Sequence, residues 1–369
     1  MLRVAPARIE QLTSLRFFAA LAVLASHLWP LAEEPNPLQP VAQTLFHEGY
    51  AGVSFFFMLS GFILSHTYQA KLTSGAISRG KYLALRIARI APLHWLLALP
   101  FGVAALVVGG VATLPATLVN LALLHSWVPD SHWYFNLVGP SWSLSDEAFF
   151  YGCFAGLAFL SVRKLAWLAG LMLLADSAMV AALILTGHGA ISQGDSLTLT
   201  HWLTYILPVT RLLDFVLGML LYRLPRPRLG TAAGTAIEIG AVGLVLGAMV
   251  GFFLLQVPEA VRLQLAYLPF MALMIWAFAC GNGVLARGMG NSGFLVLLGD
   301  ASFALYLIHL PLIRWLIPAN DAADNPLPVL VVCGLVTLAA VGLSVAVFRL
   351  VETPLLRWSR GVINRRFAR

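Results

Sequence analysis

Long apolar runs alternate with short polar segments along most of the chain. Four of the longest runs cover 15–28, 53–64, 90–108 and 329–350. About 20 apolar residues span the hydrocarbon core of a bilayer as a helix, which satisfies its own backbone hydrogen bonds there. The runs lack the strict alternation of apolar and polar residues that marks transmembrane β-strands. The pattern therefore predicts an all-α, polytopic integral membrane bundle.

Ten of the apolar runs are interpreted as membrane-crossing helices. Their expected ranges are 12–31, 49–69, 84–109, 141–161, 165–187, 201–222, 232–255, 262–281, 294–317 and 327–350. A further apolar stretch at 113–127 is short, holds Pro115 near its start and is followed by Pro129. Counting it as a span would invert every later loop against its charge. We therefore expect it to be a re-entrant or interfacial helix on the outer side.

Composition supports an assignment of nearly the whole chain to the membrane. Of the 369 residues, 60% are hydrophobic and 11% are charged, whereas an average soluble domain carries about 25% charged residues. We expect one transmembrane domain at 8–355, followed by a basic tail at 356–369. The three cysteines lie inside apolar runs without metal-ligand spacing, so no metal is expected. The first run shows no small-residue cleavage pattern and is predicted to remain as a signal anchor.

The net charge of +7 follows an alternating pattern from loop to loop. Basic residues gather at 71–86, 163–164, 223–228, 287 and 357–369. The intervening loops are neutral or carry the acidic residues Glu33, Glu34, Glu48, Asp130, Asp195, Asp321 and Asp324. This alternation is the positive-inside pattern, and it predicts that both termini are cytoplasmic. Because the basic residues set orientation in this way, we expect no nucleic-acid partner.

The first predicted span carries an arginine and a histidine. Arg16 and His27 are eleven residues apart, which leaves them about 20° apart on one helix face and roughly 16 Å apart along it. Arg16 then lies near the cytoplasmic end and His27 toward the outer end. Imidazole titrates near neutral pH, so His27 is a candidate general base for a hydroxyl group. Alternatively, Arg16 extends to the membrane interface and His27 bonds a neighbouring helix.

Two arginines open the third predicted span at its cytoplasmic side. Arg86 and Arg89 have i,i+3 spacing, which places both guanidinium groups on one helix face. Two such groups side by side suit a phosphate-bearing ligand. Alternatively, the pair is only a charge anchor at the cytoplasmic interface. Glu352, at the end of the last span, is expected to pair with a cytoplasmic cation such as Arg86 or Arg89.

A polar motif opens the fourth predicted span at its outer side. Ser143 and Glu147 share one helix face at i,i+4 spacing, and Trp142 and Asp146 share another. A carboxylate at this place can orient an imidazole or bond a polar acceptor. The alternative is that the serine caps the helix while the carboxylates complement its dipole. For Asp146 the two interpretations stay open, whereas for Glu147 we favour a functional role.

Two more polar groups lie inside predicted spans. Arg211 falls near mid-bilayer with Asp214 at i+3, so the two form either an ion pair between helices or part of a substrate path. Ser302, Tyr306 and His309 follow at spacings of four and three and form a polar stripe on one face. The stripe either lines a channel or bonds adjacent helices. The remaining histidines are interpreted as structural: His47, His66, His94, His125, His132, His188 and His201.

Seven blocks of the chain, spread over residues 8 to 355, together resemble the acyltransferase 3 family of bacterial membrane O-acyltransferases. They are LTSLRFFAALAVLASHL, GVSFFFMLSGFILS, LRIARIAPLHW, WSLSDEAFFY, RLLDFVLGMLL, LGDASFALYLIHLPLI and VETPLLRW. Their joint order and spacing are specific. The family motifs correspond here to Arg16, His27, Arg86, Arg89, Trp142, Ser143, Leu144, Glu147, Phe150 and Tyr151. Three positions depart from the family pattern: Thr13 replaces a common acidic residue, His94 a tyrosine and Asp214 a glutamate.

The resemblance implies a membrane O-acyltransferase without an appended hydrolase-like domain. It would move an acyl group, most simply acetyl, from cytoplasmic acyl-CoA to a hydroxyl of a glycan or other envelope-related acceptor at the bacterial inner membrane. Arg86 and Arg89, with Arg16, would bind the CoA phosphates. His27 would act as general base or carry the acyl group, and Glu147 would orient His27 or the acceptor.

Two other classes of protein stay open at this point. A transporter or flippase of a polar lipid-linked glycan also needs buried charges and a polar path through a helical bundle. A membrane sensor that has kept the scaffold without catalysis is the third interpretation. Acyl transfer from a CoA donor would distinguish an acyltransferase from a transporter and from a sensor.

Overall fold

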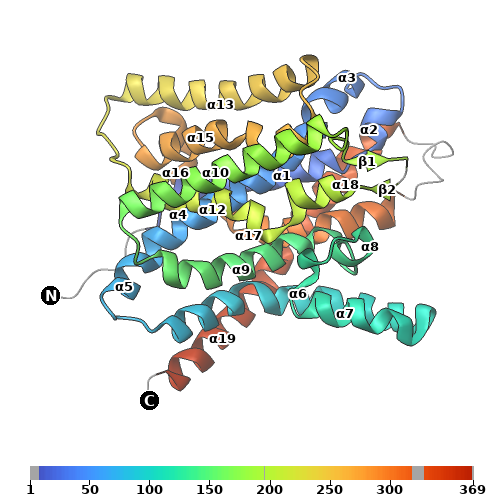
Figure 1. Cartoon of the computed structure of the whole chain (residues 1–369), viewed down its shortest axis with the longest axis horizontal. Coiled ribbons are helices and arrows are strands. Elements are labelled where there is room, and N and C mark those ends of the chain that lie inside the picture. The colour runs from blue at the N-terminus through green and yellow to red at the C-terminus, as the bar shows by residue number, and fades with distance from the viewer. Residues whose placement is uncertain (1–7, 195, 318–327, 368–369) are drawn as a thin grey trace.

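The computed structural model describes residues 8–194, 196–317 and 328–367. Among these residues the chain forms an elongated bundle of helices (Figure 1), and its sheet structure is one small antiparallel pair, β1 (Ser192–Gln193) with β2 (Ser196–Leu197). The architecture confirms the all-α fold that the apolar runs predict.

Eleven helices of at least 13 residues build the bundle. They are α1 (Glu10–Ser26), α4 (Gly52–Leu64), α6 (Arg79–Gly109), α9 (Trp142–Leu157), α10 (Val162–Leu185), α12 (Pro208–Arg223), α13 (Thr231–Leu254), α15 (Leu268–Cys280), α17 (Gly293–Leu316), α18 (Val329–Val347) and α19 (Thr353–Arg366). The shorter α-helices are α2 (Pro30–Glu33), α3 (Gln39–Val41), α5 (Ala70–Thr73), α7 (Leu114–Leu121), α8 (Ser131–Tyr134), α11 (Leu199–His201), α14 (Glu259–Val261) and α16 (Val284–Asn291).

Tighter and wider turns extend several of these helices. The π-helical turns are η1 (Ala42–Phe46), η3 (Ser65–Gln69), η7 (Trp202–Ile206), η8 (Arg262–Ala266) and η9 (Phe348–Glu352). The 3₁₀ turns are η2 (His47–Ala51), η4 (Gly110–Thr113), η5 (His125–Trp127) and η6 (Gly139–Ser141). A π-helical turn changes which face of a helix the following side chains occupy.

Eight continuous helical runs among the described residues are long and apolar enough to cross a membrane. They are Gln39–Thr73, Arg79–Leu121, Val162–Leu185, Leu199–Arg223, Thr231–Leu254, Glu259–Cys280, Gly293–Leu316 and Val329–Arg366. The other two predicted spans correspond to α1 and α9, which have only 17 and 16 residues. The chain is therefore a multi-pass membrane protein, and the count of ten crossings stays a prediction.

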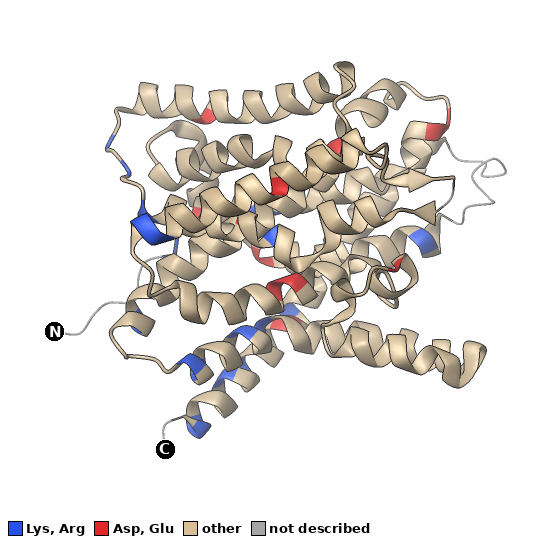
Figure 2. Cartoon of the chain, viewed as in Figure 1, with Lys and Arg blue, Asp and Glu red and all other residues tan. Residues whose placement is uncertain are grey.

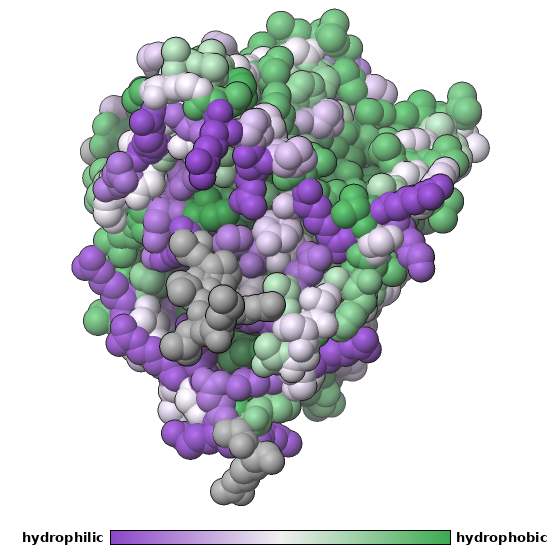
Figure 3. Space-filling view, turned by 90° about the vertical axis from the view of Figure 1, so that its left-hand side faces the viewer, coloured by the Kyte–Doolittle hydropathy of each residue, from purple (hydrophilic) through white to green (hydrophobic). Residues whose placement is uncertain are grey.

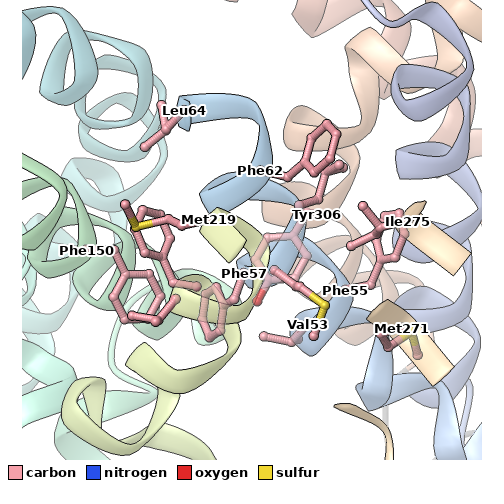
Figure 4. Close-up of a cluster of buried hydrophobic side chains, with 14 of the residues drawn as sticks. Val53, Phe55, Phe57, Phe62, Leu64, Phe150, Met219, Met271, Ile275 and Tyr306 are labelled. Atoms are coloured by element: carbon pink, nitrogen blue, oxygen red, sulfur yellow. The ribbon is translucent and has the colours of Figure 1, made fainter. Parts of the chain in front are cut away.

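The centre of the bundle is built on α4 and α12, which cross at two glycines. A Cβ atom added at Gly61 would lie 2.0 Å from the carbonyl oxygen of Phe215, and one at Gly218 would lie 1.8 Å from that of Met58. Only glycine allows such close backbone approach between membrane helices. Around the crossing, aromatic side chains of α4 and α9 pack edge to face, as Phe57 and Phe150 do at 5.0 Å (Figure 4).

The apolar stretch at 113–127 folds back along α6. The indole nitrogen Nε1 of Trp95 in α6 donates to the carbonyl of Leu121 at 2.8 Å, and Gly102 faces Thr117. At eight residues, α7 is too short to span the hydrocarbon core by itself. The hairpin agrees with the predicted re-entrant or interfacial helix.

Charge is unevenly distributed between the two ends of the bundle. The end that bears α5 and the basic helix α19 also carries most of the Lys and Arg residues (Figure 2). Seen face on, that end is covered by hydrophilic side chains, with hydrophobic ones gathering toward the flanks (Figure 3). This polarity is the arrangement that the loop charges predict.

The charge pattern suggested that Glu48 lies in an exposed outer loop, but the structure does not place it there. It is fully buried, pairs with Arg262 and accepts hydrogen bonds from the hydroxyls of Tyr50 and Tyr267, each at 2.6 Å. Burial of a carboxylate is tolerated because a cation and donors surround it. The partner cation lies 214 residues away in sequence, so local charge patterning gave no sign of it.

Candidate active site

Three cavities follow one another through the bundle between α1, α4, α9 and α17. The inner cavity has a volume of about 230 Å³, the central one about 40 Å³ and the outer one about 290 Å³. The inner and central cavities share Arg16, Glu147 and two phenylalanines as lining residues. The central and outer cavities share Val53 and Tyr306. The three cavities are therefore neighbours in a row with the smallest in the middle, and this row is called the route below.

The inner cavity brings together the three predicted phosphate-binding arginines. Arg16, Arg86 and Arg89 all line it, although Arg16 comes from α1 and the other two from α6. The start of α6 is fixed by Ser78, whose hydroxyl caps the helix by accepting from the backbone amide of Lys81 at 3.2 Å. The cavity is therefore electropositive on two sides.

The three arginines differ in how they are held. Arg86 stacks on the Tyr151 ring and donates to its hydroxyl at 3.1 Å, while that hydroxyl donates to Glu147. Arg89 forms an ion pair with Glu352 and lies over the ring of Phe303. The prediction that Glu352 pairs with one of these two arginines is confirmed.

Arg16 stands apart from the other two arginines. Within the described part of the chain, no hydrogen bond or ion pair joins its guanidinium group to another residue. It lines both the inner and the central cavities. An unpaired, half-buried guanidinium next to a cavity is a ready partner for an anionic or carbonyl group.

The central cavity is lined by polar groups from α9 and α17 between phenylalanine rings. Ser143 and Glu147 come from α9, and Ser302 and Tyr306 from α17. The hydroxyl of Ser302 is buried without a hydrogen-bond partner. Four of the residues predicted to line a substrate path or the site thus face one another across a space of about 40 Å³.

His27 lines the outer cavity at the end of α1. Its Nδ1 lies 2.8 Å from the carbonyl oxygen of Val23. A carbonyl only accepts, so Nδ1 carries the proton, and in the neutral ring Nε2 is left as a proton acceptor. The last turn of α1 therefore orients His27; Glu147, the predicted orienting residue, instead bonds Tyr151.

His309 of α17 lies beside His27. The ring centroids are 5.1 Å apart at 62°, and His309 is fully buried. Its Nδ1 lies 3.1 Å from the carbonyl oxygen of Leu305, while its Nε2 has no hydrogen-bond partner. His309, the third residue of the predicted polar stripe, thus lies beside His27 and does not line the central cavity.

The outer cavity also contains residues that sequence reasoning did not select. His47 and His201, interpreted from the sequence as structural, line it together with Tyr205 and Arg314. The sequence did offer one indication for Arg314. It is a cation at the outer end of a span, where the positive-inside rule places few basic residues. His47 and His201 carried no such signal, because they stand at the ends of predicted spans.

Arg211 lies outside the route that the cavities form. It is fully buried, pairs with Asp214 at 3.5 Å and donates to the Ser54 hydroxyl at 2.7 Å and the Leu263 carbonyl at 2.8 Å. It lines none of the three cavities. The expected Arg211–Asp214 ion pair is confirmed between α4, α12 and η8, and the assignment of Arg211 to a substrate path stays a prediction.

Comparisons with known proteins show one protein family and two relatives that the chain resembles. A family model described as an acyltransferase domain matches residues 9–349. The chain is 32% identical to the acyltransferase MdmB of Streptomyces mycarofaciens, over 84% of this chain and 80% of that protein. It is 28% identical to the exopolysaccharide production protein ExoZ of Rhizobium meliloti, over 85% and 92% of the two chains. No solved structure matches significantly.

Proposed function

Because this chain belongs to the acyltransferase 3 family of membrane O-acyltransferases, we propose that it moves an acetyl group from cytoplasmic acetyl-CoA to a hydroxyl of an envelope glycan or related acceptor. The observation that carries the proposal is the row of three neighbouring cavities that leads from the arginine-lined inner cavity to the free Nε2 of His27 in the outer cavity.

Donor binding is assigned to the inner cavity. CoA carries phosphate groups, and guanidinium groups bind phosphate through paired, charge-assisted hydrogen bonds. Arg86 and Arg16 present such groups without a carboxylate partner within bonding distance, whereas Arg89 is held by Glu352. Phosphate entering the cavity would compete with Glu352 for Arg89.

A small acyl group suits the narrow middle of the route. The central cavity of about 40 Å³ holds little more than one water, whose share of liquid volume is about 30 Å³. An acetyl group needs the least rearrangement of Phe56, Phe57 and Phe303, which enclose this space. The thioester would pass this point to reach His27.

A glycan acceptor suits the outer cavity. Tyr50, Phe135, Trp142, Tyr205 and Tyr306 provide ring faces there, and aromatic residues with a polar tip suit amphipathic ligands. The relative named as an exopolysaccharide production protein supports the same class of acceptor.

The proposed reaction uses His27 as general base. Nε2 takes the proton from the acceptor hydroxyl while the oxygen attacks the thioester carbonyl carbon. The C–O bond of the ester forms, the C–S bond breaks, and the proton passes from His27 to the CoA thiolate. In a two-step variant His27 carries the acetyl group transiently before the hydroxyl attacks. Glu147 and Tyr151 hold Arg86 in place for the donor.

The proposed setting is the bacterial inner membrane, with both termini cytoplasmic. The basic end that bears α5 and α19 would then face the cytoplasm, where acetyl-CoA is made (Figure 2). The outer cavity would open toward the envelope, and the lipid bilayer surrounds the bundle.

The test uses purified protein in nanodiscs with radiolabelled acetyl-CoA and membrane extract as the source of acceptor. Wild type is expected to release free CoA and to form a labelled product, and the His27→Ala variant neither. Equal activity in wild type and His27→Ala would remove His27 from the chemistry. A transporter or a sensor needs no acyl donor, so the absence of any label transfer by wild type would favour those classes.

A further inference from the structure

A second large cavity lies on the opposite side of α1 from the proposed active site. It has a volume of about 450 Å³ and is enclosed by α1, α4, α13, α15, α16 and η1. Every residue that lines it is apolar. Four of the nine methionines of the chain face it: Met249, Met271, Met274 and Met289. Methionine side chains are flexible and adapt to occupants of irregular shape.

The cavity reaches from the outside of the bundle to its centre. Phe18 belongs to α1, which packs against α4, α16 and α17, yet 45% of its surface is exposed. Leu246 of α13 and Leu285 of α16, on the far wall, are 45% and 38% exposed. α13, which lines the cavity, lies at the edge of the bundle (Figure 1). The exposed apolar side chains of its walls are therefore within reach of a lipid chain.

Only a thin wall separates this cavity from the outer cavity. Leu45 and Phe46 line the apolar cavity, and the next residue, His47, lines the outer cavity. On α1, Ala25 faces the apolar cavity while His27, two residues later, faces the outer one. The two cavities are therefore neighbours on either side of one short segment of backbone, close enough for the polar head and the apolar chain of one molecule.

We propose that the apolar cavity binds the hydrocarbon chain of a lipid-linked acceptor whose polar head lies in the outer cavity beside His27. This inference rests on the proposed function. Burial of the chain would hold the head group against His27 and exclude water from the site. It predicts that the acetylated product is a lipid and not a free sugar.

The experiment follows label from radiolabelled acetyl-CoA in membranes that contain each variant, with partition of the product between chloroform–methanol and water. After unreacted acetyl-CoA has been removed from the aqueous phase, wild type is expected to give labelled product in the organic phase, and His27→Ala in neither phase. Ala22→Phe, which fills the cavity from α1, should lower organic-phase label about tenfold, the equivalent of roughly two methylene groups expelled from the cavity. Val242→Trp fills the same cavity from the peripheral helix α13 and should have the same effect.

The matched control is Leu244→Phe. Leu244 also lies on α13 but is 50% exposed and does not line the cavity, so its variant should match wild type. Labelled product that appears only in the aqueous phase, or unchanged organic-phase product in a folded cavity-filling variant, would overturn the inference while supporting acyl transfer. No labelled product in either phase for wild type would instead contradict the proposed function.

Discussion

His27 and His309 meet edge to face at 5.1 Å, one at the end of α1 and the other within α17. The Nδ1–H group of each ring donates to a backbone carbonyl of its own helix. The acceptor is the carbonyl of Val23 for His27 and that of Leu305 for His309. The two Nε2 nitrogens are therefore both left without a proton in the neutral rings. A pair of such rings gives the site a second imidazole next to the proposed base.

The first prediction concerns that second imidazole. In His309→Gln, kcat for acetyl transfer should fall by about 10²-fold, since one positioned proton-transfer group contributes about that factor or more. The KM for acetyl-CoA should stay the same, because His309 lies far from the inner cavity. Steady-state kinetics measure both constants. The control is His132→Gln, an exposed residue of α8. An equal fall of kcat in that variant would show that the effect is not specific to His309.

The second prediction concerns Arg86. It has no carboxylate partner within ion-pair distance, so Arg86→Gln should remove one phosphate contact without stranding a buried acid. The dissociation constant for CoA should rise by about tenfold, as expected for a lost charge-assisted hydrogen bond of 1.5–3 kcal/mol. Isothermal titration in nanodiscs gives the constant. Arg163→Gln, at an exposed position in the first turn of α10, should bind CoA as wild type does.

The third prediction separates stability from donor binding at Arg89. Arg89→Gln leaves Glu352, which is 2% exposed, without its cation and should destabilise the fold by about 3–5 kcal/mol. The double variant Arg89→Gln with Glu352→Gln should recover most of that loss but still bind CoA weakly. Thermal unfolding and CoA titration test the two effects. Full recovery of CoA binding in the double variant would exclude Arg89 from the donor site.

The fourth prediction concerns the ion pair of Arg211 and Asp214. Arg211→Met leaves a buried carboxylate unpaired and should lower stability by about 3–5 kcal/mol. Combining it with Asp214→Leu should restore much of the loss, because a buried pair is often replaceable by apolar residues. Protein that still folds should show wild-type KM values, and a raised KM for the acceptor would return Arg211 to the substrate path.

The fifth prediction concerns the length of the acyl group. Phe56 lines both the inner and the central cavities, so Phe56→Ala should widen the narrow part of the route. The ratio of propionyl to acetyl transfer should rise about tenfold, since fitting the one added methylene in a tight pocket is worth about 1–3 kcal/mol. Competition between the two thioesters measures the ratio, with Phe294→Ala as control, at an exposed position of α17 that lines none of these cavities.

Several features of the fold and site follow from local sequence. The apolar runs predict the helices, and the short run with Pro115 predicts the fold-back of α7. The i,i+3 spacing of Arg86 and Arg89 and the polar stripe of α17 predict which side chains share a face. These features depend on helical periodicity alone, which the sequence displays directly.

Other features depend on contacts between distant segments. The burial of Glu48 depends on Arg262, and the position of His309 beside His27 depends on how α1 packs along α17. The presence of His47 and His201 in the outer cavity depends on η2 and η7, whose turns direct the side chains. No local pattern encodes such packing, so a single sequence does not reveal it.

The narrowness of the central cavity also has a consequence for the cell. A route that joins two sides of an energised membrane is a potential leak for protons, and each charge that crosses dissipates about 2.3 kcal/mol per 100 mV. A space of about 40 Å³ between phenylalanine rings leaves little room for a file of water molecules. The constriction that we propose selects a small acyl group would thus also limit the leak of protons across the membrane.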